Sequence, residues 1–151
     1  MERLQFKTSI NSTASHVYNT MLGKETYKQW TALFSPTSDF EGSWEKGSKI
    51  LFVGTSKEGK REGMVASIVE NLPGRFVSIQ HKGIVDGDNE ITEGPQVEGW
   101  AGALENYSFS EQDGITTVTV DADVNQEYAD YFKETWPKAL SKLKQLCEEK
   151  Q

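Results

Sequence analysis

The sequence has one cysteine and few basic residues, and both shortages narrow the functions that it could have. The single cysteine, Cys147, excludes a disulfide within the chain and any cysteine-rich zinc site. The 151 residues include 16 lysines and arginines against 23 aspartates and glutamates, which gives a formal net charge of −7. An acidic chain of this kind argues against binding of a nucleic acid or an anionic membrane surface, because both need clustered cations.

Long hydrophobic runs and catalytic motifs are also missing. No apolar stretch approaches the roughly 20 residues of a membrane-spanning helix, and residues 1–6 do not form a signal peptide, so we expect a cytoplasmic protein. The sequence has no Gly-x-Ser-x-Gly elbow and no glycine-rich phosphate loop. Its two histidines, His16 and His81, have no plausible third ligand, so we expect no metal site and predict no cofactor.

Length and composition favour one folded domain spanning residues 1–151. Hydrophobic residues make up 36% of the chain and aromatic residues 11%, so a packed core is expected. A chain of this size can bury roughly two thirds of its unfolded surface. No internal repeat or low-complexity segment interrupts the sequence.

The most informative pattern is at the C-terminal end, where residues 125–150 are typical of one amphipathic helix. Its apolar residues recur at steps of three and four: Tyr128, Phe132, Trp136, Ala139, Leu140, Leu143, Leu146 and Cys147. Pro137 lies inside this pattern, where its missing N–H donor and its clash with the Lys133 carbonyl favour a bend. Alternatively, the helix begins near Trp136, with Pro137 in its first turn.

The remainder of the chain predicts two short helices and several strands. Residues 3–10 alternate in polarity, as in a half-buried strand, and two short helices of about 13–22 and 24–30 follow, separated by Gly23. Further strands are expected near 37–41, 48–54, 60–70 and 74–85, and residues 104–123 form a hairpin that turns at Asp113-Gly114. This order predicts an α+β fold with a curved antiparallel sheet of about six to seven strands.

Several segments resemble a known family when they are taken together. They are Trp30-Thr31, the segments 42–47 and 63–69, Leu72-Pro73, the hairpin segments 107–109 and 114–120, and Trp136 with 140–144. With these segments the chain resembles the START-like superfamily, which has the helix-grip fold. It looks most like the branch of homologues of the activator of the heat-shock protein 90 ATPase. The resemblance implies a sheet that grips the C-terminal helix, with an apolar cavity between them.

The resemblance also implies a range of functions, because members bind lipids, sterols, polyketides or plant hormones. We therefore predict that the chain binds a small hydrophobic or amphipathic molecule, lipid-like or polyketide-like, in the cavity. The candidate ligand-binding residues are Trp30, Phe52, Met64, His81, Trp100, Glu105, Tyr107, Phe132 and Trp136. One alternative is a chaperone-cofactor module with an exposed apolar patch, and another is an enzyme of the cyclase or hydrolase type. A homodimer through an edge strand is also open.

His81 and Glu105 are the candidate polar residues of the cavity. His81 shares a strand face with Val77 and Ile79, so it could hydrogen-bond a ligand or act as a base, or it could be an ordinary core histidine. Glu105 is in register with Tyr107 and could pair with His81. The alternative is that Glu105 lies in water at the frayed end of its strand, because burial of an unpaired carboxylate is costly.

The segment between residues 82 and 103 departs from the family branch, because it is long, acidic and contains glycine. Asp86, Asp88 and Glu90 have the spacing of a calcium loop. However, Ile91 and Val97 occupy the positions at which a calcium loop needs a glycine and a bidentate acid. We therefore expect a solvated loop and no calcium site. Trp100, with glycines nearby, suits a mobile lid over the cavity mouth, or else a residue that anchors the loop.

Overall fold

The computed structural model describes residues 1–149, and it confirms the predicted α+β class. Its elements are β1 (Glu2–Ile10), α1 (Ala14–Leu22), α2 (Lys24–Thr31), β2 (Asp39–Gly42), β3 (Lys49–Thr55), β4 (Arg61–Leu72), β5 (Phe76–Asp86), β6 (Asn89–Ile91), β7 (Leu104–Gln112), β8 (Ile115–Val124) and α3 (Ala129–Glu149). A 3₁₀ turn, Gln126–Tyr128, precedes α3. The sheet has eight strands in the order β1-β8-β7-β5-β4-β3-β2, with β6 paired to β5.

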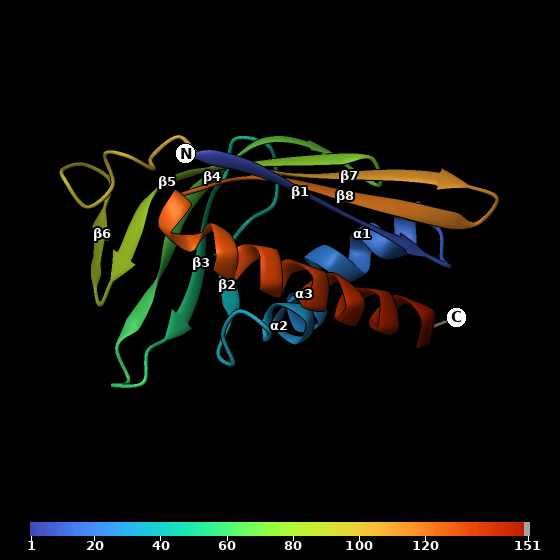
Figure 1. Cartoon of the computed structure of the whole chain (residues 1–151), viewed down its shortest axis with the longest axis horizontal. Helices are drawn as coiled ribbons and strands as arrows, with labels where there is room; N and C mark the ends of the chain where they lie inside the picture. The colour runs from blue at the N-terminus through green and yellow to red at the C-terminus, as the bar shows by residue number, and fades with distance from the viewer. Residues whose placement is uncertain (150–151) are drawn as a thin grey trace.

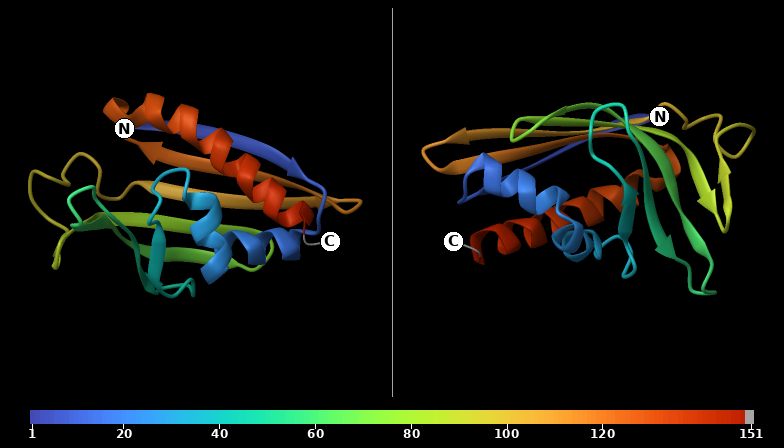
Figure 2. Two further views of the ribbon diagram at one scale, coloured as in Figure 1. Left: turned by 90° about the horizontal axis from the view of Figure 1, so that it is seen from below. Right: turned by 180° about the vertical axis from the view of Figure 1, so that it is seen from behind.

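All three helices lie on one face of the sheet. In Figure 1 α3 lies beneath the strands, and in the left view of Figure 2 it runs obliquely across them beside α1 and α2. It packs on β1, α1 and α2. The β4–β5 pair has register shifts at Val65/Ala66 and Ile68/Glu70, and such bulges bend a strand and increase its twist. The sheet therefore curves around the helix, as the resemblance implies.

The two short helices begin and end close to where the sequence predicts. Thr13 is the N-cap of α1, and its hydroxyl accepts a hydrogen bond from the His16 N–H at 3.2 Å. Gly23 separates α1 from α2. On α2, Trp30 is 1% exposed, and its indole N–H donates to the Met21 carbonyl at 2.9 Å. This bond holds the angle between the two helices.

The C-terminal helix keeps most of its predicted buried stripe. Trp136 and the aliphatic residues that follow it are buried, and Phe132 is half-buried. Tyr128 differs, because it belongs to the 3₁₀ turn before the helix and is 53% exposed. Pro137 lies inside α3, so the alternative in which the helix begins near Trp136 is wrong. Lys150 lies outside the described residues.

The hairpin β7–β8 is paired as predicted. Tyr107 faces Val120 and Phe109 faces Val118, and the turn residues Asp113 and Gly114 both have positive φ angles, 54° and 80°. This register places Tyr107 against Trp136 of α3 and Phe109 against Tyr18 of α1. Within residues 1–149, no helix is both long and apolar enough to cross a membrane.

The acidic segment after β5 is more ordered than the predicted solvated loop. It forms a small hairpin in which β6 pairs with the end of β5, and Gly87 turns with a φ of 65°. Lys60 pairs with Asp86, and Lys49 pairs with Glu90 at 2.5 Å. Among residues 1–149, no group of three histidine, cysteine, aspartate or glutamate side chains could hold a metal ion.

Candidate functional site

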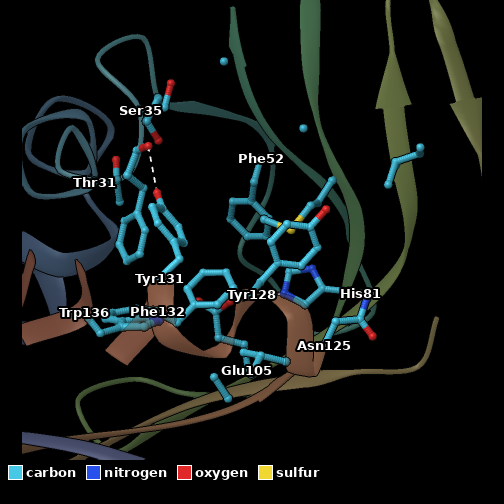
Figure 3. A pocket seen from close by; sticks show the side chains of 18 of the residues that line it. Thr31, Ser35, Phe52, His81, Glu105, Asn125, Tyr128, Tyr131, Phe132 and Trp136 are labelled. Atoms are coloured by element: carbon cyan, nitrogen blue, oxygen red, sulfur yellow. Dashed lines mark hydrogen bonds and ion pairs between the residues drawn. The ribbon is translucent and has the colours of Figure 1, made fainter. Parts of the chain in front are cut away.

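A pocket of about 560 Å³ opens between the concave face of the sheet, α2 and the first half of α3. Figure 3 shows Phe132 and Trp136 of α3 on one side of it and Phe52 and His81 of the sheet on the other. The structure brings all the candidate residues of the sequence analysis to this pocket: Trp30, Phe52, Met64, His81, Trp100, Glu105, Tyr107, Phe132 and Trp136. Their role in binding a ligand stays a prediction.

Trp136 is the centre of the aromatic wall. Its ring centroid lies 5.0 Å from that of Phe34, 5.8 Å from Trp30 and 6.2 Å from Tyr107. It also stacks on Phe6 of β1 at 6.1 Å. Trp136 thus packs against side chains from α2 and from two strands, so it belongs both to the wall of the pocket and to the hydrophobic core.

The polar side chains of the pocket meet at Glu105. One carboxylate oxygen accepts a hydrogen bond from the Tyr107 hydroxyl, and the other lies 3.1 Å from Nε2 of His81. The Glu105 side chain is 19% exposed, and His81 as a whole is 4% exposed. Glu105 therefore faces the pocket together with Tyr107, and the alternative of a frayed strand end in water is wrong.

Nδ1 of His81 has no hydrogen-bond partner among the described residues, although it is buried. A carboxylate can only accept, so Nε2 carries the hydrogen in the His81–Glu105 contact. In the neutral imidazole, Nδ1 is then an acceptor. Buried polar atoms usually have a partner, so this acceptor is a candidate contact for a bound molecule.

Trp100 lies against His81. The two rings stack with a centroid distance of 5.4 Å and an interplanar angle of 23°. The loop that carries Trp100 is tied to β5 by the Gly102 N–H, which donates to the His81 carbonyl at 2.8 Å, and by Val97, which is 2% exposed. The structure therefore shows the anchored arrangement, and movement of this loop as a lid stays a prediction.

The two buried tyrosines of the pocket remain neutral. Burial raises the pKa of the Tyr107 and Tyr27 hydroxyls well above the usual value of 10, and the negative charge of Glu105 raises both further. The Tyr107 hydroxyl is therefore a permanent donor to Glu105. Cys147 is also unreactive as a nucleophile, because burial raises the pKa of its thiol to about 11.

Sequence reasoning missed part of the lining. Tyr27, Phe34, Tyr128 and Tyr131 add aromatic surface, and Glu62, Asp123 and Glu127 add carboxylates. Tyr131 precedes Phe132 and is spaced three residues after Tyr128, so a wider helical face would have included it. The acidic residues gave no such signal, because alternation along a strand does not distinguish the mouth of a pocket from open solvent.

Asp123 should give the pocket rim a measurable pH dependence. Its carboxylate pairs with Arg3 at 2.9 Å, and this hydrogen bond lowers the pKa of Asp123. A lowered pKa contributes stability above the ordinary aspartate value of about 3.9, and that stability is lost as the pH falls. Asp123→Asn should therefore lower the free energy of unfolding near pH 7 by no more than about 1 kcal/mol, because Arg3 is exposed.

Urea unfolding of Asp123→Asn and wild type between pH 3 and pH 7 checks this expectation. The difference between the two proteins should shrink toward zero in acid. Asp121→Asn is the matched control on the same strand, since that carboxylate accepts from the neutral amide of Gln5 at 2.8 Å. A constant difference at every pH would contradict the assigned role of Asp123.

The fold and the pocket together define a class. An antiparallel sheet that grips a C-terminal helix, with a pocket between them, is the arrangement of the START-like, helix-grip proteins. Residues 11–148 match the family model described as Activator of Hsp90 ATPase homolog 1-like protein, and the chain belongs to this family. A search of curated proteins found no match.

Solved structures of similar fold include proteins from several bacteria. Protein NE0264 from Nitrosomonas europaea has a TM-score of 0.74 at 16% identity, covering 98% of this chain and 95% of that one. The Aha1 dimer from Colwellia psychrerythraea has a TM-score of 0.69 at 18% identity, covering 95% and 94%. DynU16, from the dynemicin biosynthetic locus, has a TM-score of 0.69 at 12% identity, covering 98% of this chain and 48% of that one. At these identities the likenesses show the fold alone.

Proposed function

We propose that the pocket between the sheet and α3 binds a small hydrophobic or amphipathic molecule. The observation that carries the proposal is a pocket of about 560 Å³ with largely aromatic walls. Known ligand sites have volumes of roughly 300–1,000 Å³, apolar walls and a few convergent polar groups. The His81–Glu105–Tyr107 cluster supplies such a polar group here.

Binding of the neutral fluorescent probe N-phenyl-1-naphthylamine tests the proposal. Met64→Trp should fill the pocket, because Met64 lines it from β4. Val69→Trp is the matched control, since Val69 lies on the same strand, is 45% exposed and is not part of the pocket. Wild type and Val69→Trp should enhance the probe's fluorescence equally, and Met64→Trp should bind it about tenfold more weakly, or a loss of about 1.4 kcal/mol.

If Met64→Trp bound the probe as tightly as wild type, the probe would bind elsewhere, and the result would count against the pocket as the binding site. Absence of any fluorescence enhancement with wild type would count against the proposal as a whole. Urea unfolding of both tryptophan variants shows whether a loss of binding reflects a filled pocket or an unfolded protein.

A second candidate function is a chaperone-cofactor role, favoured by exposed apolar side chains beside the pocket. Leu33, Tyr131 and Tyr128 are 42%, 45% and 53% exposed, and the Tyr131 hydroxyl donates to the Phe34 carbonyl, which ties α3 to the segment after α2. The ATPase rate of Hsp90 from the same cells tests this role. Stimulation by wild type that is lost in Leu33→Asp would support it, and an unchanged rate would remove it.

A homodimer is the partner suggested by the Aha1 dimer of similar fold. The strands β1 and β2 are the two edges of the sheet, and free edges can pair with another copy. Light scattering coupled to size-exclusion chromatography should give the mass of two chains. The mass of one chain across the accessible concentrations would contradict the dimer.

A further inference from the structure

We propose that the molecule bound in this pocket is an organic cation, with an apolar ring body and a protonated amine. This inference rests on the proposed function and names the chemistry of its ligand. The pocket is lined by four acidic residues, Glu62, Glu105, Asp123 and Glu127, of which Asp123 is already paired with Arg3, and no lysine or arginine of the described residues lines it. An anionic ligand such as a fatty acid would meet repulsion from these groups and no compensating cation.

Glu105 is the inner carboxylate and the one that most needs a positive partner. Its hydrogen-bond partners among the described residues are the neutral Tyr107 hydroxyl and the His81 imidazole. A partly buried carboxylate without a cation is unfavourable, and a ligand ammonium group beside it would relieve this. The charge of Glu105 also raises the pKa of Tyr27 and Tyr107, so its field reaches across the pocket.

His81 is the second group of the pocket that has room for a partner from a ligand. Its Nδ1 is buried and has no hydrogen-bond partner among the described residues. In the neutral imidazole the same atom is a free acceptor, which suits an ammonium N–H. The His81 side chain is 5% exposed and lies among the lining residues in Figure 3. The missing partner of Nδ1 is a second observation, beside the acidic residues, that points to a polar group on the ligand.

The aromatic wall suits a cation as well as an apolar ring. The faces of tryptophan and tyrosine rings attract an ammonium group, because the ring faces carry partial negative charge. Trp100 stacks on His81, and Phe52 lies edge-on to the same imidazole at 6.1 Å, so aromatic rings surround the acceptor. At the mouth, Glu62 and Glu127 are exposed and extend the negative charge outward, which favours the approach of a cation.

Three probes with the same naphthalene body test the inference: 1-naphthylmethylamine, 1-naphthalenemethanol and 1-naphthoate. Their dissociation constants are measured by calorimetry near pH 7 at low salt, where the amine is protonated and the acid is ionised. We expect the amine to bind at least about tenfold more tightly than the naphthoate, with the alcohol between them. The differences in affinity among the three probes should decrease as salt is added, because salt screens the charges.

Variants assign the preference to the carboxylates. Glu105→Gln should bring the amine and the alcohol to within about twofold of each other. Glu127→Gln, at an exposed position where folding is not at risk, should reduce the preference partly. Glu134→Gln is the control, because Glu134 is exposed on α3 and lies outside the pocket, and it should leave all three constants unchanged.

The outcomes separate this inference from the proposed function. Equal binding of the three probes, or tighter binding of naphthoate, would overturn the cationic ligand and leave pocket binding in place. An amine preference that survives both Glu105→Gln and Glu127→Gln would also overturn it. Absence of binding by all three probes would overturn both the inference and the proposed pocket function.

Discussion

Replacing Trp136 with alanine should lower the free energy of unfolding by about 4 kcal/mol, within the range of 3–5 kcal/mol seen for large aromatic deletions in cores. Trp136 is 4% exposed, and it contacts aromatic rings from β1, α2, the segment after α2, and β7. Alanine would leave a cavity next to the existing pocket, where the rigid sheet cannot collapse. Since small domains are stable by about 5–15 kcal/mol, this variant loses a large share of the total.

Urea unfolding followed by circular dichroism measures the effect. Trp100→Ala is the matched control, because it deletes the same side chain from a half-exposed loop position where water can fill the space. It should cost less than half as much as Trp136→Ala, on the order of 1–2 kcal/mol. A larger loss for Trp100→Ala than for Trp136→Ala would show that the core is not centred where the structure places it.

Gly63→Ala should destabilise the protein by at least about 3 kcal/mol. Gly63 is near the start of β4, paired with Val53 on one side and Val85 on the other, and has a φ of 153°. A Cβ atom there would lie 1.9 Å from the Phe52 carbonyl oxygen. Because that oxygen belongs to the backbone of β3, no side-chain rotation removes the clash, and the β3–β4 pairing must change.

Gly59→Ala is the control for Gly63→Ala, because Gly59 also has a positive φ, 81°, but nothing lies within 4 Å of an added Cβ. It should cost about 1–2 kcal/mol, the ordinary penalty for a left-handed alanine. The comparison also bears on the pocket, since Gly63 and Phe52 both line it. Similar losses for the two variants would contradict the close strand approach at Gly63.

The fold could be predicted where the apolar residues repeat with a single clear spacing, that of a strand or that of a helix. The hairpin β7–β8 alternates strictly around Asp113-Gly114, so its bounds were predicted nearly to the residue. The helix α3 keeps its stripe across Pro137, although it begins at Ala129, four residues later than predicted. The strand β6 was not predicted, because three residues are too few for alternation to register. Its pairing depends on the turn at Gly87 and on ion pairs with distant lysines, which no local pattern reports.

The part of the candidate site that lies on the strands could be predicted, because alternation along a strand tells which residues share a face. Register placed His81, Glu105 and Tyr107 on one concave face, and the structure joins them in one cluster. The stacking of Trp100 on His81 could not be predicted, because it depends on the path of an irregular loop. The exposed rim residues Glu62 and Glu127 were missed for the same reason, since they come together only through the bend of β4 and the turn before α3.

Native mass spectrometry of the protein purified from its own cells, followed by organic extraction, tests the central claim most directly. The account predicts a reproducible small adduct on wild type that is lost on denaturation and is missing from Met64→Trp. A nitrogen base among the extracted molecules would also fit the acidic, aromatic lining. A wild-type mass equal to that of the polypeptide alone, or an adduct that persists in Met64→Trp, would contradict the claim that this pocket holds a small molecule.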